Sequence, residues 1–110
     1  MVLNFQKDIS LRTYNTFGID VKSKKFIGIQ STDVLKAVLA ENQGAQVLLL
    51  GGGSNLLLTK DFDGLTIRIE NRGIEILKED EYGARIKVAA GENWHDFVLW
   101  CLKKDFGGVE

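Results

Sequence analysis

Three consecutive glycines, Gly51-Gly52-Gly53, stand between two apolar runs and constrain this chain more than any other feature. The runs are residues 47–50 and 56–58, and a short polar pair separates the glycines from the second run. Glycine has no Cβ, so its backbone reaches positive φ angles and leaves room for a ligand beside the main chain. The pattern predicts two apolar strands joined by a loop whose N–H groups converge on one point.

Such a loop is suited to holding a phosphate, and a diphosphate in particular. Ser54 and Asn55 add a hydroxyl and an amide donor, so an anion would be bound by hydrogen bonds and local dipoles without a formal positive charge. The loop is not a P-loop, because no lysine follows Gly53. It is not a Rossmann fingerprint either, because Leu56 stands where the third glycine belongs and no helix N-cap pattern follows. A plain tight turn between buried strands is the alternative.

Composition excludes several classes of partner. The 110 residues allow one domain at most, and 45% hydrophobic with 26% charged residues is typical of a soluble globular protein. A formal charge of −1, with basic and acidic residues mixed along the chain, indicates neither nucleic acid nor an anionic membrane as partner. No segment approaches the roughly 18 apolar residues of a membrane span, and no leader pattern opens the chain. One cysteine and one histidine favour a cytoplasmic protein without disulfides or a metal site.

A parallel β-α-β unit is predicted around the glycine loop. Residues 25–29 are a short apolar strand, and residues 46–50 are the next, apolar throughout as expected of a strand covered on both faces. Between them, Ser31 or Thr32 caps a helix that runs to about Asn42. The buried stripe of that helix is predicted to consist of Val34, Leu35, Val38 and Leu39.

Residues 1–20 show no sustained periodicity and are predicted to form an ordered loop. Within it, Asn15 and Thr16 are suited to hydrogen-bond nearby backbone, while Phe17 and Ile19 would anchor the loop apolarly. Both a role beside a bound ligand and pure anchoring fit these residues.

After the glycine loop the pattern changes from parallel to antiparallel. Residues 61–64 are predicted to turn, and residues 65–69 alternate as a strand with one polar face. Residues 74–77 and 84–90 are two strands joined by a polar, solvated loop, which is a hairpin. A second, antiparallel sheet therefore begins near Asn71.

An amphipathic helix follows the hairpin. Asn93 is its N-cap and the pair Gly107-Gly108 its end, with His95 on the exposed side as a surface histidine. Its apolar face is predicted to contain Trp94, Phe97, Val98, Cys101 and Leu102, the cysteine as a small core residue. A hairpin and one helix leave the second sheet without further partners, so we expect a fragment of a longer protein.

Three stretches, residues 15–20, 49–57 and 90–95, resemble in order and spacing the N-terminal third of the UDP-N-acetylenolpyruvoylglucosamine reductase family of bacterial cell-wall synthesis. The glycine motif alone is shared more loosely with other flavoproteins of the vanillyl-alcohol-oxidase type. The resemblance implies an α+β fold of the PCMH type. Residues 1–70 would be an FAD-binding subdomain with a small parallel β-α-β unit, and residues 71–110 the incomplete start of a second, antiparallel subdomain.

The resemblance also implies which residues meet the cofactor FAD. The pyrophosphate loop would consist of Gly51, Gly52, Gly53, Ser54, Asn55 and Leu56. The family's catalytic arginine, serine and glutamate belong to segments beyond residue 110, so no catalytic residues are expected in this chain, and its single cysteine and histidine predict no metal ligands.

For the parent protein the resemblance implies a cytoplasmic, monomeric oxidoreductase of peptidoglycan synthesis, and with it a part in cell shape and division. NADPH would reduce FAD, and hydride would pass to an enolpyruvyl ether on UDP-N-acetylglucosamine, giving UDP-N-acetylmuramate. The fragment itself is expected to be inactive and prone to self-association. The alternatives are another FAD-dependent oxidoreductase of the same fold, a non-catalytic phosphate- or nucleotide-binding module, and a purely structural domain.

Overall fold

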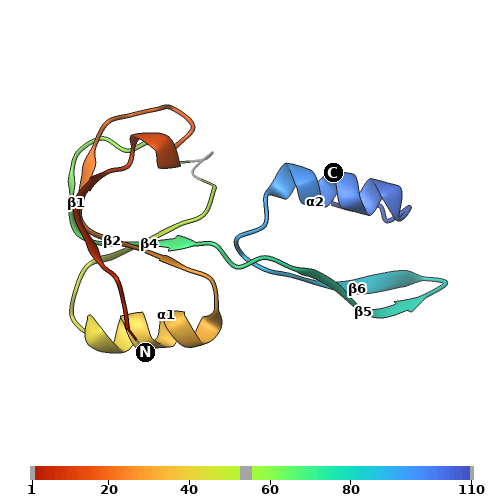
Figure 1. The fold of residues 1–110 in the computed structure, drawn as a ribbon. Coiled ribbons are helices and arrows are strands. Elements are labelled where there is room, and N and C mark those ends of the chain that lie inside the picture. The colour runs from red at the N-terminus through yellow and green to blue at the C-terminus, as the bar shows by residue number, and fades with distance from the viewer. Residues whose placement is uncertain (1, 53–55, 110) are drawn as a thin grey trace. The chain divides into compact units, whose positions relative to one another are not determined.

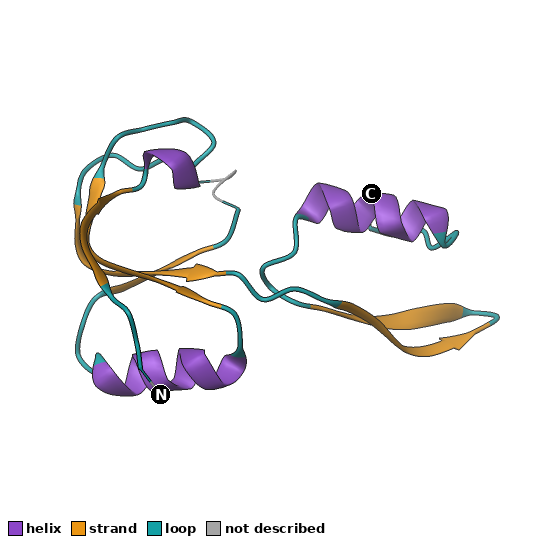
Figure 2. Cartoon of the chain, in the orientation of Figure 1, coloured by secondary structure: helices purple, strands orange, loops and turns teal. Residues whose placement is uncertain are grey.

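The computed structural model describes residues 2–52 and 56–109. The chain divides into two compact units, Met1–Glu70 and Asn71–Glu110, called unit 1 and unit 2 below. Each unit combines strands with one α-helix, so the fold class is α+β, as predicted (Figure 2). Among the described residues, no helix has the length and apolar character needed to cross a bilayer.

Unit 1 is built on a four-stranded mixed sheet with the strand order β1-β2-β4-β3. Both β2 and β3 run parallel to β4, which lies between them, and β1 is antiparallel to β2. This arrangement confirms the predicted parallel β-α-β unit and makes β2 and β4 the two interior strands of the sheet. The strands are β1 (Gln6–Ser10), β2 (Lys22–Ile29), β3 (Val47–Leu50) and β4 (Phe62–Ile69).

The N-terminal segment contains more structure than its sequence predicted. Residues 1–20 were expected to be a loop, but they include β1 and a short 3-10 helix, η1 (Arg12–Tyr14). The strand β1 is a polar edge strand, and Asp8 interrupts it with φ of 51°. An edge strand needs no apolar alternation, which is why the period-two pattern is missing.

The helix α1 (Thr32–Glu41) covers one face of this sheet. Its N-cap is Ser31, whose Oγ accepts a hydrogen bond from the N–H of Val34 at 3.3 Å, as the capping pattern predicted. Val38 is fully buried against the sheet, but Leu39 is 43% exposed, so its predicted place in the buried stripe is wrong. Leu39 lies about 100° around the helix from Val38, at the rim of the contact.

The opposite face of the sheet is covered by the segment that contains η1; Figure 1 shows η1 and α1 on opposite sides. Tyr14 stacks on Phe26 of β2 with ring centroids 4.8 Å apart. Thr66 is completely buried on β4 and shares a 2.7 Å hydrogen bond with Ser23. The predicted strand at residues 65–69 is confirmed, and Thr66 on its polar face is buried because a central strand is covered on both sides.

Two further expectations for this sheet are wrong. The strand β3 was predicted to be covered on both faces, but it is an edge strand and Leu49 is 59% exposed, with only Leu50 fully buried. Residues 61–64 were predicted to be a turn, but β4 begins at Phe62. The N–H of Leu65 donates to the carbonyl of Gln46 at 2.9 Å, which extends the pairing toward the start of β4.

Unit 2 consists of a hairpin and one helix, as predicted. The strands β5 (Ile74–Asp80) and β6 (Gly83–Val88) are antiparallel and extend into the expected loop, leaving a two-residue turn. The helix α2 (Trp94–Lys103) is capped by Asn93, whose Oδ1 accepts from the N–H of Asp96 at 3.0 Å. Its expected apolar face is only partly covered. Phe97 and Cys101 are buried, whereas Trp94 and Leu102 are 64% and 54% exposed.

Candidate functional site

The glycine stretch begins directly after β3. Gly51 and Gly52 follow Leu50, the last residue of that strand, and both are exposed. Because β2, β3 and β4 are parallel, their carboxyl ends lie at one edge of the sheet, which is where ligands bind in open parallel sheets. The predicted site residues Gly53, Ser54 and Asn55 lie outside the described residues, and Leu56, also predicted, is half-buried on the return.

Neither packing nor backbone conformation within the described chain requires glycine at positions 51 and 52. A Cβ added to Gly51 or Gly52 would meet no atom within 4 Å, and neither residue has a positive φ. Gly64 is the opposite case, since its Cβ would lie 2.6 Å from the carbonyl oxygen of Gln46. The glycines after β3 thus leave open space beside the main chain, which is the space that an anion held by backbone N–H groups requires.

A polar cluster borders the strand that leads into the glycine loop. Leu50 is the register partner of Arg68 on β4, and Arg68 is in turn the register partner of Gly28 on β2. The guanidinium of Arg68 lies 5.2 Å from the ring centroid of Tyr14 and donates to Glu70 Oε2 at 2.6 Å. Because Glu70 neutralises Arg68, the cluster adds no net positive charge near the loop.

Glu70 completes this cluster and lies across Gly28. Its Oε1 accepts from Nε2 of Gln30 at 2.8 Å, and a Cβ on Gly28 would strike the Glu70 carboxylate. The cluster lines a pocket of about 380 Å³ together with Tyr14 and residues near the N-terminus. Sequence reasoning missed Arg68 and Glu70, since the only signal was a polar residue in a strand and the strand order was not known.

Residues 15–19 differ in what their side chains contact. Asn15 is 7% exposed; its Nδ2 donates to the carbonyls of Leu11 and Ile19, and its Oδ1 accepts from the N–H of Ile19. Its predicted bonding to nearby backbone is confirmed. Phe17 is 61% exposed, so its predicted anchoring role is wrong, whereas Ile19 packs against the buried cluster as expected.

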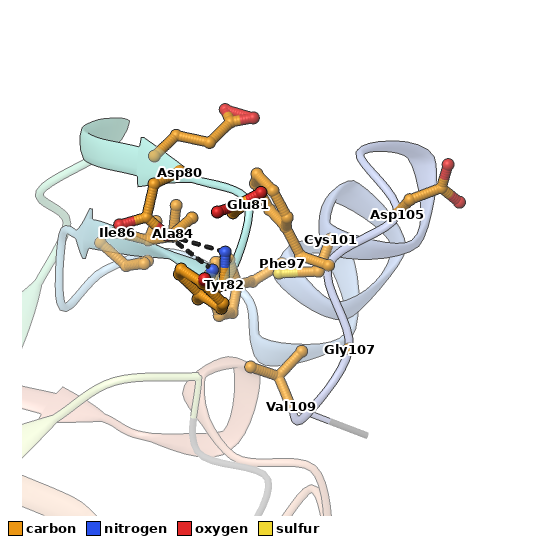
Figure 3. A pocket seen from close by; sticks show the side chains of 14 residues that line it. Asp80, Glu81, Tyr82, Ala84, Ile86, Phe97, Cys101, Asp105, Gly107 and Val109 are labelled. Carbon is orange, nitrogen blue, oxygen red and sulfur yellow. Dashed lines mark hydrogen bonds between the residues drawn. The ribbon is translucent and has the colours of Figure 1, made fainter.

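Unit 2 has a pocket of its own, of about 630 Å³, between the hairpin and α2. Figure 3 shows Phe97 and Cys101 projecting from α2 into it. His95 is exposed, in agreement with the surface histidine that was predicted. Within residues 2–52 and 56–109, no three His, Cys, Asp or Glu side chains gather in a way that could hold a metal ion.

Comparisons with known proteins now bear on the site. A family model described as FAD binding domain matches residues 24–110. UDP-N-acetylenolpyruvoylglucosamine reductase of Flavobacterium johnsoniae is 50% identical over 108 residues, covering 98% of this chain and 32% of the relative. The enzyme of the same name from Pseudomonas putida is 42% identical over 112 residues, covering 100% of this chain and 33% of the relative. The chain thus spans about a third of the length of these relatives.

A solved structure shares the fold. The crystal structure of the UDP-N-acetylenolpyruvylglucosamine reductase from Thermus caldophilus superposes with a TM-score of 0.68 at 19% sequence identity. The match covers 98% of this chain and 36% of the other.

Proposed function

Because the chain belongs to the family of FAD-binding domains, we propose that it is the FAD-binding N-terminal portion of a UDP-N-acetylenolpyruvoylglucosamine reductase. The relatives that support this proposal match it over nearly its whole length. On this proposal, unit 1 is the FAD-binding subdomain with the pyrophosphate loop, and unit 2 is the first part of a second subdomain.

The observation that carries the proposal is the open space beside Gly51 and Gly52 at the carboxyl end of β3. Backbone N–H groups of residues 51–56, with the side chains of Ser54 and Asn55, would hold the pyrophosphate through neutral donors. The sheet behind the loop is well packed, with Leu50 and Ile67 fully buried, so the loop is attached to a rigid support.

For the whole protein we propose the reaction that the relatives' name describes, with NADPH as reductant, in peptidoglycan synthesis in the cytoplasm. FAD, when bound, supplies the hydride chemistry. The residues of this chain bind and orient that cofactor. The substrate would be an enolpyruvyl ether carried on a UDP-sugar.

A titration of FAD, followed by flavin fluorescence and run beside adenosine diphosphate and flavin mononucleotide, tests the site. The informative variant is Gly52→Val, because its side chain enters open space and should leave the fold intact. Gly83→Val is the matched control: Gly83 also has no atom within 4 Å of an added Cβ, but it lies in β6. We expect Gly52→Val to weaken FAD and adenosine diphosphate about tenfold or more, and Gly83→Val to leave both affinities unchanged.

Circular dichroism must show that both variants are folded. Equal FAD affinity of wild type and a folded Gly52→Val would contradict the proposed site. For the full-length protein, NADPH oxidation that does not rise above the oxygen-dependent background when the UDP-sugar is added would indicate a different flavin-dependent oxidoreductase.

A further inference from the structure

The turn formed by residues 15–18 is fixed by a dense set of hydrogen bonds. The N–H of Gly18 donates to the carbonyl of Asn15 at 3.2 Å, and Gly18 has φ of 64°, which favours glycine. The Asn15 side chain adds three bonds to the backbone of Leu11 and Ile19, at 2.7, 3.1 and 3.0 Å. Because Asn15 is buried, these bonds are shielded from water, and the turn keeps one conformation.

This rigid turn presents Phe17 to solvent. Phe17 is 61% exposed, and it does not belong to either of the two core clusters of the described part of unit 1. Its neighbours Tyr14 and Ile19, by contrast, both pack against the buried cluster around Phe26. A turn that is fixed by four hydrogen bonds and displays a large apolar ring is preorganised for a contact outside the described fold.

The turn lies on the same side of the sheet as the approach to the glycine loop. Tyr14, directly before the turn, stacks on Phe26 and lies beside Arg68. Arg68 is the register partner of Leu50, the last residue before the glycines. On the return side of the loop, Leu58 packs against the same cluster as Tyr14. The turn and the return side of the glycine loop therefore adjoin one cluster, and the contact between Arg68 and Tyr14 links that cluster to the strand before the glycines.

We propose that Phe17 is a stacking surface for a flat heteroaromatic ring of the ligand whose phosphates lie on the glycine loop. This inference rests on the proposed function. An aromatic side chain stacks favourably on a planar heterocycle, and a ring held at one end complements phosphates held at the other. FAD carries two such rings, adenine and isoalloxazine, and both have the required chemistry.

The test compares Phe17→Ala and Phe17→Tyr in the full chain, with four ligands: FAD, adenosine diphosphate, flavin mononucleotide and inorganic pyrophosphate. We expect Phe17→Ala to weaken FAD about tenfold and to leave pyrophosphate unchanged. A parallel loss of affinity for adenosine diphosphate would show that the adenine ring stacks on Phe17. A loss of affinity for flavin mononucleotide would show that the isoalloxazine ring does. Phe17→Tyr should restore affinity, and Tyr82→Ala, which removes an aromatic side chain that is 91% exposed in unit 2, should change nothing.

Three results would overturn the inference. Unchanged affinities for all ring-bearing ligands in a folded Phe17→Ala, while Gly52→Val loses FAD, would remove Phe17 from the site and leave the proposed function standing. An equal loss of affinity for pyrophosphate in Phe17→Ala would show that the Phe17 side chain supports the glycine loop and does not stack on a ring. Failure of the folded wild-type chain to bind any of the four ligands would overturn this inference and the proposed function together.

Discussion

The two units use similar parts and bury them very differently. Each contains one α-helix of ten residues, capped by a side-chain oxygen of Ser31 or Asn93. In unit 1 the strand β4 has a neighbour on each edge and a packed layer on each face, and Ile67 at its centre is fully buried. In the described part of unit 2, the buried apolar side chains are Phe97 and Cys101.

The difference shows how the number of strands in a sheet affects the stability of each unit. A two-stranded sheet gives each strand one neighbour, and such hairpins are marginally stable in water without further packing. Unit 2 accordingly leaves large apolar side chains exposed, among them Leu77, Trp94, Leu99 and Leu102. We therefore expect unit 1 to be the stable support for the glycine loop and unit 2 to unfold more easily.

The largest effect is expected in the centre of unit 1. Ile67→Ala removes fully buried atoms from β4, so the free energy of unfolding of unit 1 should fall by about 2–5 kcal/mol. Amide hydrogen exchange of β2 and β4 measures this change. Both tryptophans of the chain, Trp94 and Trp100, lie in unit 2, so their fluorescence follows that unit separately. A loss below about 1 kcal/mol would contradict the central position of β4.

A smaller loss of stability is expected when Gly64 is replaced by alanine, and none when Gly52 is. In Gly64→Ala the new methyl group would lie 2.6 Å from the Gln46 carbonyl oxygen and 2.9 Å from Phe62 ring atoms, which should destabilise unit 1 by about 1–3 kcal/mol. Gly52→Ala meets no atom and should unfold like the wild type in urea. Equal stability losses in the two variants would mean that Gly52 has a packing role and would weaken its assignment to a ligand.

The smallest effects on stability are expected at the two helix caps. Ser31→Ala and Asn93→Ala each remove one capping hydrogen bond and should each cost about 1 kcal/mol. Because unit 2 has less stability to lose, Asn93→Ala should shift the tryptophan unfolding curve to visibly lower temperature, while Ser31→Ala leaves that curve in place. Matching shifts in both variants would show that the two units unfold as one.

Local sequence patterns were sufficient to predict part of the fold. Both helices were predicted from their caps and apolar spacing, and the hairpin from two apolar runs around a polar turn. The edge strand β1, the burial of Thr66 and the exposure of Leu49 depend on strand order, which links residues far apart in sequence. Residues 61–64 were mistaken for a turn because Gly64 serves a close approach to Gln46 instead.

The candidate site divides in the same way. The glycine stretch could be recognised in the sequence itself, because three consecutive glycines allow unusual backbone angles and leave room for a ligand beside the main chain. The neighbouring pair Arg68 and Glu70 could not, since the pairing of Leu50 with Arg68 becomes visible only in the register of β3 and β4. Within one short motif, the sequence also could not show that Asn15 fixes the turn while Phe17 remains exposed.

The measurement that tests the central claim most directly is a nitrogen-edited NMR titration of the chain with FAD. If the glycine loop on unit 1 is the binding site, the largest shifts of backbone N–H signals will fall on residues 51–56, with unit 2 largely unchanged. Shifts concentrated on the residues that line the pocket between the hairpin and α2, with residues 51–56 unmoved, would contradict the assignment of the cofactor to the glycine loop.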